Sequence, residues 1–95
     1  MSLSTHVLDT ERGRPASGVR VELYSGDERL ADATTDEDGR IADLAPGLAA
    51  GVYRLVFHPA SPFFRRIELE VELDDGHTHV PLLVSSYSCA SYRGS

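Results

Sequence analysis

Turn-forming residues recur at short, regular intervals along this sequence, and they limit the length of any helix or strand more than any other feature. Clusters of glycine, proline, serine and aspartate fall at residues 13–18, 25–27, 36–39, 46–51, 59–62 and 74–76. The segments between them are mostly shorter than an average helix but long enough for strands of ordinary length. The sequence therefore predicts a succession of short strands joined by turns.

The residues between the turns alternate with a period of two, which is typical of half-buried strands. Residues 67–73 alternate aliphatic side chains with three glutamates, and residues 19–24 and 52–57 show the same period. Residues 42–50 favour a helix by composition, but Pro46 and Gly47 interrupt them, so we expect a loop there. The expected fold is an all-β, antiparallel two-sheet sandwich of seven to eight short strands, with little or no helix, in a single domain over residues 1–95.

The composition excludes several classes of protein. Of the 95 residues, 41% are hydrophobic and 25% charged, which is the balance of a globular domain rather than a disordered chain. Nine arginines face fifteen acidic residues, so the net charge of −6 disfavours binding to nucleic acid or to anionic membranes. No apolar run approaches the roughly 18 residues of a membrane span. The single cysteine excludes an intrachain disulfide, and we expect a cytoplasmic protein.

Histidines provide the first candidates for chemistry. His77 and His79 stand two residues apart in an expected strand, so they share one face and suit a metal pair or an acid–base pair. His6 lies in the N-terminal strand and could join them as a third imidazole around zinc. The alternative is that these histidines are solvated or structural.

Arg40 and Cys89 are two further candidates. Arg40 follows the acidic stretch 36–39, whose glycine is in the wrong position for a calcium loop, so a tight turn is expected instead. The arginine could bind a planar, oxygen-rich group or pair with the acidic turn itself. Cys89 could be a nucleophile, but a small buried thiol is the stronger expectation.

Several segments together resemble one known family, the 5-hydroxyisourate hydrolases, which are transthyretin-related proteins. The matching segments are Leu-Ser-Thr-His-Val-Leu-Asp at 3–9, Gly-x-Pro-Ala at 13–16, Thr-Asp-x-Asp-Gly-Arg at 35–40, His-x-His-Val-Pro-Leu-Leu at 77–83 and Tyr-Arg-Gly-Ser at 92–95. The resemblance covers the whole chain, and its C-terminal tetrapeptide separates the hydrolases from transthyretin.

The resemblance implies a transthyretin-like fold and hydrolysis of 5-hydroxyisourate to 2-oxo-4-hydroxy-4-carboxy-5-ureidoimidazoline in urate degradation. It implies a homotetramer with active sites between dimers, and catalysis without metal or other cofactor. By motif, the catalytic residues are His6, Arg40, His79 and Ser95; the substrate-binding residues are Arg40, His77, Tyr92 and Ser95.

The chain also departs from the family pattern. Residues 58–66 replace about twenty family residues that include a short helix, so that helix is expected to be missing. Ser86 stands where the family has proline, and Cys89 where it has an aromatic residue. Two other functions stay open: a non-catalytic transthyretin-like module that binds a small ligand, and a generic sandwich in which the histidines have no role.

Overall fold

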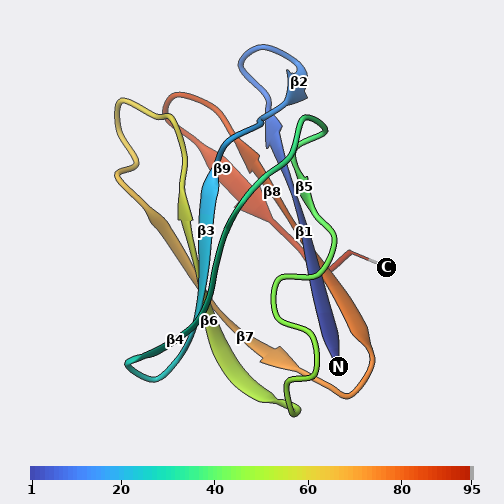
Figure 1. The fold of residues 1–95 in the computed structure, drawn as a ribbon. Coiled ribbons are helices and arrows are strands. Elements are labelled where there is room, and N and C mark those ends of the chain that lie inside the picture. The colour runs from blue at the N-terminus through green and yellow to red at the C-terminus, as the bar shows by residue number, and fades with distance from the viewer. Residues whose placement is uncertain (95) are drawn as a thin grey trace.

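The computed structural model describes residues 1–94 as two stacked β-sheets (Figure 1). These residues include no helix, and accordingly none that is long and apolar enough to cross a membrane. The strands are β1 (Ser2–Asp9), β2 (Arg14–Pro15), β3 (Arg20–Ser25), β4 (Glu28–Thr34), β5 (Arg40–Ile41), β6 (Gly51–His58), β7 (Ile67–Leu73), β8 (His77–Val84) and β9 (Cys89–Ser91).

One sheet has the order β2-β1-β8-β9, with β5 also paired to β1, and the other has the order β4-β3-β6-β7. The expected all-β sandwich is confirmed. One pairing differs from the expected antiparallel pattern: β1 runs parallel to β8, and every other strand pairing within residues 1–94 is antiparallel. Two parallel strands need a long connection between them. Here the chain between β1 and β8 forms the second sheet, which serves as that connection.

Alternate residues of the strands build the core between the sheets. Leu23, Leu55 and Phe57 are fully buried from one sheet, and Leu3 and Leu82 from the other. Burying each such side chain contributes roughly 1.5–3 kcal/mol relative to leaving it exposed. In β7 the three glutamates are exposed while both terminal residues are buried, as the alternation predicts.

The connections also follow the sequence in part. Residues 42–50 form an irregular loop, as predicted. Residues 59–66 contain no helix, as expected, and form a short turn instead. In this turn the Ser61 hydroxyl accepts hydrogen bonds from the amides of Phe63 and Phe64 and donates one to the carbonyl of Ser86. Phe63 packs edge-on against Phe64, with 4.9 Å between ring centroids. This turn is therefore tied to the 85–88 turn.

The expectation that Cys89 is a buried thiol is wrong, because Cys89 is exposed. It belongs to β9, a three-residue strand at the edge of its sheet whose residues are all exposed. A strand with one neighbour and little cover leaves even a small apolar residue in contact with solvent.

The outer face of the second sheet holds a buried carboxylate, Glu22, which is 5% exposed. Its Oε2 accepts from Tyr24 at 2.8 Å and from Arg29 at 3.3 Å, and its Oε1 lies 2.6 Å from Nε2 of His58. Arg20 also reaches it, at 3.2 Å. The hydrogen bond with His58, followed by that of Tyr24, lowers the pKa of Glu22 from 4.5 to about 2. The alternation predicted an outward side chain here but not its burial.

Replacing Glu22 by glutamine is expected to lower the free energy of unfolding at pH 7 by about 1–3 kcal/mol, the usual effect of breaking buried charge-assisted hydrogen bonds. A carboxylate whose pKa is lowered on folding stabilises the native state above its unfolded pKa, and this contribution fades between pH 4.5 and about 2. Urea titrations followed by circular dichroism should therefore show the two proteins converging as the pH falls. A difference that stays constant down to pH 2 would contradict this account.

Candidate active site

The outer face of the first sheet brings together the candidates from three strands. His6 lies on β1, Arg40 on β5 and His79 on β8, and His6 is paired directly with Arg40. In the parallel pairing of β1 and β8, Ser4 stands opposite His79. Thr5 and Thr78 are buried on the inner face, so the residues that alternate with them, including His6, His77 and His79, share the outer face. The predicted same-face arrangement of His77 and His79 is confirmed.

These side chains line a hollow of about 560 Å³, a volume suited to a small organic molecule. The strands β5 and β1 run side by side (Figure 1), and residues of both line the hollow. Its lining residues are Ser4, Thr5, His6, Asp36, Asp38, Arg40, Ile41, Ala42, His77 and His79. Three predicted histidines and the predicted arginine thus meet at one place.

Ser4 links the two histidines of β8. Its Oγ is 2.9 Å from Nε2 of His77 and 2.7 Å from Nδ1 of His79. Ser2 continues the chain, with Oγ 2.5 Å from Nδ1 of His77. A line of hydrogen bonds therefore runs from the half-buried His79 to the exposed His77 and on to Ser2. Within residues 1–94, Nε2 of His79 forms no hydrogen bond, and His79 lines the hollow.

The environment keeps His79 neutral near pH 7. Burial lowers the pKa of His79 below its ordinary value of 6.5, and the positive charges of His6, His77 and Arg40 lower it further. A neutral imidazole can accept a proton, which is the property required of a general base.

His6 carries a buried atom without a partner. Among the buried side-chain nitrogen and oxygen atoms of residues 1–94, Nε2 of His6 is the one that forms no hydrogen bond with the described part of the chain. Leaving such an atom unpaired costs roughly 1–3 kcal/mol, so it points to a partner that is not among residues 1–94. A ligand in the hollow could supply that partner.

Arg40 is held in position by its turn but not neutralised by it. The Asp36 carboxylate accepts the amides of Asp38 and Arg40, both at 2.9 Å, and therefore shapes the turn. Gly39 takes a positive φ of 75°, and a Cβ there would lie 2.5 Å from the carbonyl oxygen of Val7. The predicted tight turn is confirmed. Within residues 1–94 the Arg40 guanidinium forms no ion pair, so it is available to an oxygen-rich ligand.

The C-terminal tail lies against His79. The amide of Gly94 donates to the carbonyl of His79 at 2.7 Å, extending the pairing of β8 and β9. A Cβ on Gly94 would lie 2.7 Å from Cδ2 of the His79 ring, so glycine permits this close approach. Arg93 pairs with Asp74 at 3.2 Å.

Tyr92, a tail residue that the resemblance assigns to substrate binding, does not line the hollow. Tyr92 is 60% exposed and lines a separate depression with Leu69, Val71 and Thr78. Ser95 lies outside the described residues, so its role stays a prediction.

The geometry of the side chains bears on the alternative of a three-histidine zinc site. Across residues 1–94, no three His, Cys, Asp or Glu side chains converge in the manner of a metal site. The contacts of Nδ1 of His79 and of both ring nitrogens of His77 are with serine hydroxyls. These three ring nitrogens are therefore engaged by hydroxyl groups.

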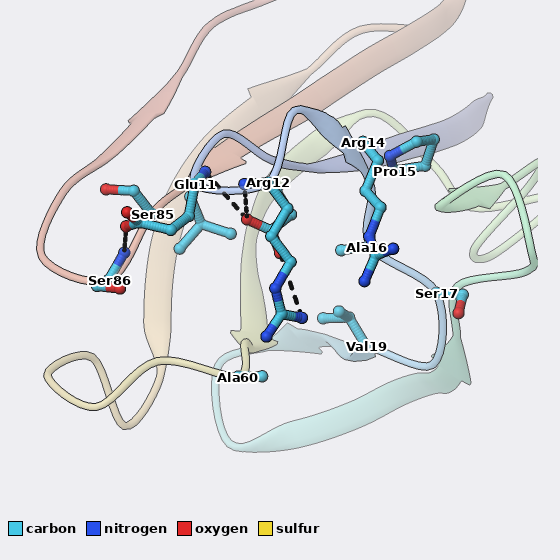
Figure 2. A pocket seen from close by; sticks show the side chains of 12 residues that line it. Glu11, Arg12, Arg14, Pro15, Ala16, Ser17, Val19, Ala60, Ser85 and Ser86 are labelled. Atoms are coloured by element: carbon cyan, nitrogen blue, oxygen red, sulfur yellow. Dashed lines mark hydrogen bonds and ion pairs between the residues drawn. The ribbon is translucent and has the colours of Figure 1, made fainter.

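A second hollow, of about 330 Å³, lies at the end of the sandwich near the Ser85–Ser86 turn (Figure 2). Arg12 and Arg14 border it, and the Glu11 carboxylate accepts the amide of Ser86 at 3.1 Å. None of its lining residues is a histidine. It therefore lacks a base that works near pH 7, and the histidine-lined hollow is the stronger candidate.

The strand order and the two-sheet packing define a transthyretin-like sandwich, and solved structures agree. The structure of Klebsiella pneumoniae 5-hydroxyisourate hydrolase is similar with a TM-score of 0.93 and 36% identity, over 100% of both chains. Sea bream transthyretin in complex with thyroxine is similar with a TM-score of 0.86 and 26% identity, over 99% of this chain and 95% of that one.

Sequence comparison defines the family. The chain belongs to the HIUase/Transthyretin family, whose profile matches residues 3–94. The 5-hydroxyisourate hydrolase of Deinococcus radiodurans is 42% identical, over 98% of this chain and 95% of the relative. That alignment extends over 113 positions although this chain has 95 residues, so the relative contains residues that this chain lacks.

Sequence reasoning missed Ser4, whose hydroxyl lies within hydrogen-bonding distance of both His77 and His79. Its signal was present: Ser2, Ser4 and His6 alternate along one strand and so share a face. The missing information was that this strand pairs with the strand of His77 and His79, about 75 residues away.

Proposed function

We propose that this protein hydrolyses 5-hydroxyisourate to 2-oxo-4-hydroxy-4-carboxy-5-ureidoimidazoline in urate degradation. The convergence of His6, Arg40 and His79 on one hollow supports this activity most directly. Curated relatives at 36–42% identity over 98% of the chain are named 5-hydroxyisourate hydrolase.

His79 acts as the general base in the proposed reaction. Water attacks the carbonyl carbon of the cyclic amide and gives a proton to Nε2 of His79, while the new C–O bond forms. The C–N bond then breaks, and the same proton passes to the departing nitrogen. Arg40 holds the planar substrate and stabilises negative charge on the carbonyl oxygen. His6 positions substrate or water through its otherwise unpaired Nε2.

The roles of the remaining candidates rest on the resemblance. His77 and Ser95 contribute to substrate binding, and Ser95 also to catalysis. Within one chain Tyr92 lines a different depression, so its contact with substrate requires that assembly bring it to the histidine-lined hollow of another subunit.

The protein acts as a homotetramer whose active sites are completed between dimers. Family membership supports assembly, and so do exposed aromatic residues on a small domain: Phe63, Tyr87 and Tyr92 are 64%, 72% and 60% exposed. Light scattering should report a tetramer at micromolar concentration, and a fully active monomer would refute this assembly.

The exposed thiol of Cys89 suits the reducing cytoplasm, which we propose as the location of the protein.

The activity is tested by adding the protein to freshly generated 5-hydroxyisourate and following the decay of its ultraviolet absorbance. Decay faster than the spontaneous rate, unchanged by a chelator, is expected. Decay at the spontaneous rate would refute the enzyme and favour the ligand-binding module. Loss of activity on chelation with recovery in zinc would instead favour the three-histidine metal site.

The pH dependence of the reaction reports on His79. Because burial and the charges of His6, His77 and Arg40 lower the pKa of His79, its unprotonated form still predominates at pH 6.5. Asp36 and Asp38 also line the hollow, but the Asp36 carboxylate is engaged by its turn. Activity, measured as kcat/KM, is therefore expected to fall on the acid side with a midpoint below 6.5. A midpoint at or above 6.5 would contradict the assignment.

A further inference from the structure

The Ser4 hydroxyl stands between two imidazoles and has a single proton to donate. Its Oγ is 2.9 Å from Nε2 of His77 and 2.7 Å from Nδ1 of His79. If the hydroxyl donates to one ring, the other ring must donate to the hydroxyl oxygen, because two unprotonated nitrogens cannot both be satisfied. The tautomers of His77 and His79 are therefore coupled through this one atom.

Two arrangements of protons satisfy the whole chain. In the first, His79 donates from Nδ1 to Ser4, Ser4 donates to Nε2 of His77, and His77 donates from Nδ1 to Ser2. In the second, every donor and acceptor is reversed, and His79 carries its proton on Nε2. The first arrangement leaves Nε2 of His79 with a free lone pair toward the hollow, which is the form of a general base.

We propose that Ser4 is a positioning residue that couples the tautomer of His79 to that of His77 and relays the Nδ1 proton of His79 to His77. This inference rests on the proposed function. When water gives a proton to Nε2 of His79, the Nδ1 proton moves to the Ser4 oxygen, and the Ser4 proton moves to Nε2 of His77. The added charge then resides on His77. The reverse sequence returns one proton to the departing nitrogen, so no proton is gained or lost.

The surroundings of the two rings give this relay its direction. His79 is half-buried and lies close to His6 and Arg40, where a positive charge is poorly solvated and repelled. His77 is exposed and bonded to Ser2 at the rim of the hollow. Moving the charge from His79 to His77 transfers it from a half-buried ring to an exposed one.

Ser4→Ala and Ser4→Thr separate the relay from simple packing. The alanine variant removes the hydroxyl, and kcat is expected to fall about 10- to 100-fold, part of the range for a positioned base. The threonine variant keeps the hydroxyl and should retain activity to within about threefold. Ser17→Ala, an exposed serine outside the hollow, is the matched control and should match the parent protein.

Two further readouts distinguish the relay from a structural role. The dependence of kcat on the D₂O fraction should be curved in the parent protein, since several protons move together, and linear in Ser4→Ala. Nitrogen NMR of the His79 ring should show its tautomer equilibrium shift in Ser4→Ala and in His77→Gln, whether or not the protein hydrolyses 5-hydroxyisourate. A parent protein without activity refutes the proposed function alone. An active Ser4→Ala variant, or a His79 tautomer indifferent to both substitutions, overturns the relay.

Discussion

His79→Gln is expected to lower kcat for 5-hydroxyisourate hydrolysis by about 10²- to 10⁴-fold, the usual contribution of a positioned general base. Glutamine is similar in length and can still bond to Ser4, so the packing around β8 is preserved. It cannot accept a proton near neutral pH. The loss should therefore appear in kcat, with little change in the circular dichroism spectrum.

His58→Gln is the matched control, because His58 lies outside the hollow. It lies on the other sheet, 2.6 Å from the Glu22 carboxylate, and does not line the hollow. We expect this control to unfold more easily while keeping its kcat. Equal loss of kcat in both variants would show that His79 acts through stability rather than catalysis.

The sequence predicts the strands well because their signal is local. Alternation in β7 and the Pro46–Gly47 interruption each depend on a few neighbouring residues, and the structure confirms both. The meeting of His6 with His77 and His79 is one of the alternatives that the residues alone offer, but only the resemblance adds Arg40 to them, since nothing in the local pattern says which strands are neighbours.

Long-range contacts explain what the sequence could not predict. Glu22 reads as a solvent-facing residue of an alternating strand, but Arg29 and His58 from the two adjacent strands cover it. The parallel pairing of β1 with β8 likewise decides that Ser4 meets two histidines. Cys89 differs in the other direction: it is exposed although a buried thiol is expected. The average burial of cysteine does not reveal that this one lies in an edge strand.

Removing residues 92–95 is expected to abolish turnover and leave the sandwich folded. The truncation removes the hydrogen bond from the Gly94 amide to His79 and the exposed ion pair between Arg93 and Asp74. Surface ion pairs of this kind add little stability. The core strands all lie before residue 92. Loss of even one positioned hydrogen bond in a site costs roughly tenfold to a hundredfold in rate, and the wall beside His79 is lost as well.

Gly94→Ala tests the same contact with a single methyl group. The new Cβ would lie 2.7 Å from Cδ2 of His79 and 3.1 Å from its carbonyl oxygen, so the imidazole must turn away or the tail must detach. Either movement misplaces Nε2 of the base, and we expect a fall in kcat of about tenfold or more. Gly76→Ala is the control: its nearest neighbour is Asp74 Oδ1 at 3.4 Å, an ordinary contact, and it should keep full activity.

Circular dichroism and the absorbance assay together decide the outcome of both changes. A truncated protein with an unchanged spectrum and at least half its activity would show that the tail is not part of the site. If Gly94→Ala is inactive while the truncated protein is active, the added methyl group is harmful but the tail is dispensable. If both lose activity with the spectrum unchanged, the tail belongs to the site, and the place of Gly94 against the His79 ring is required for turnover.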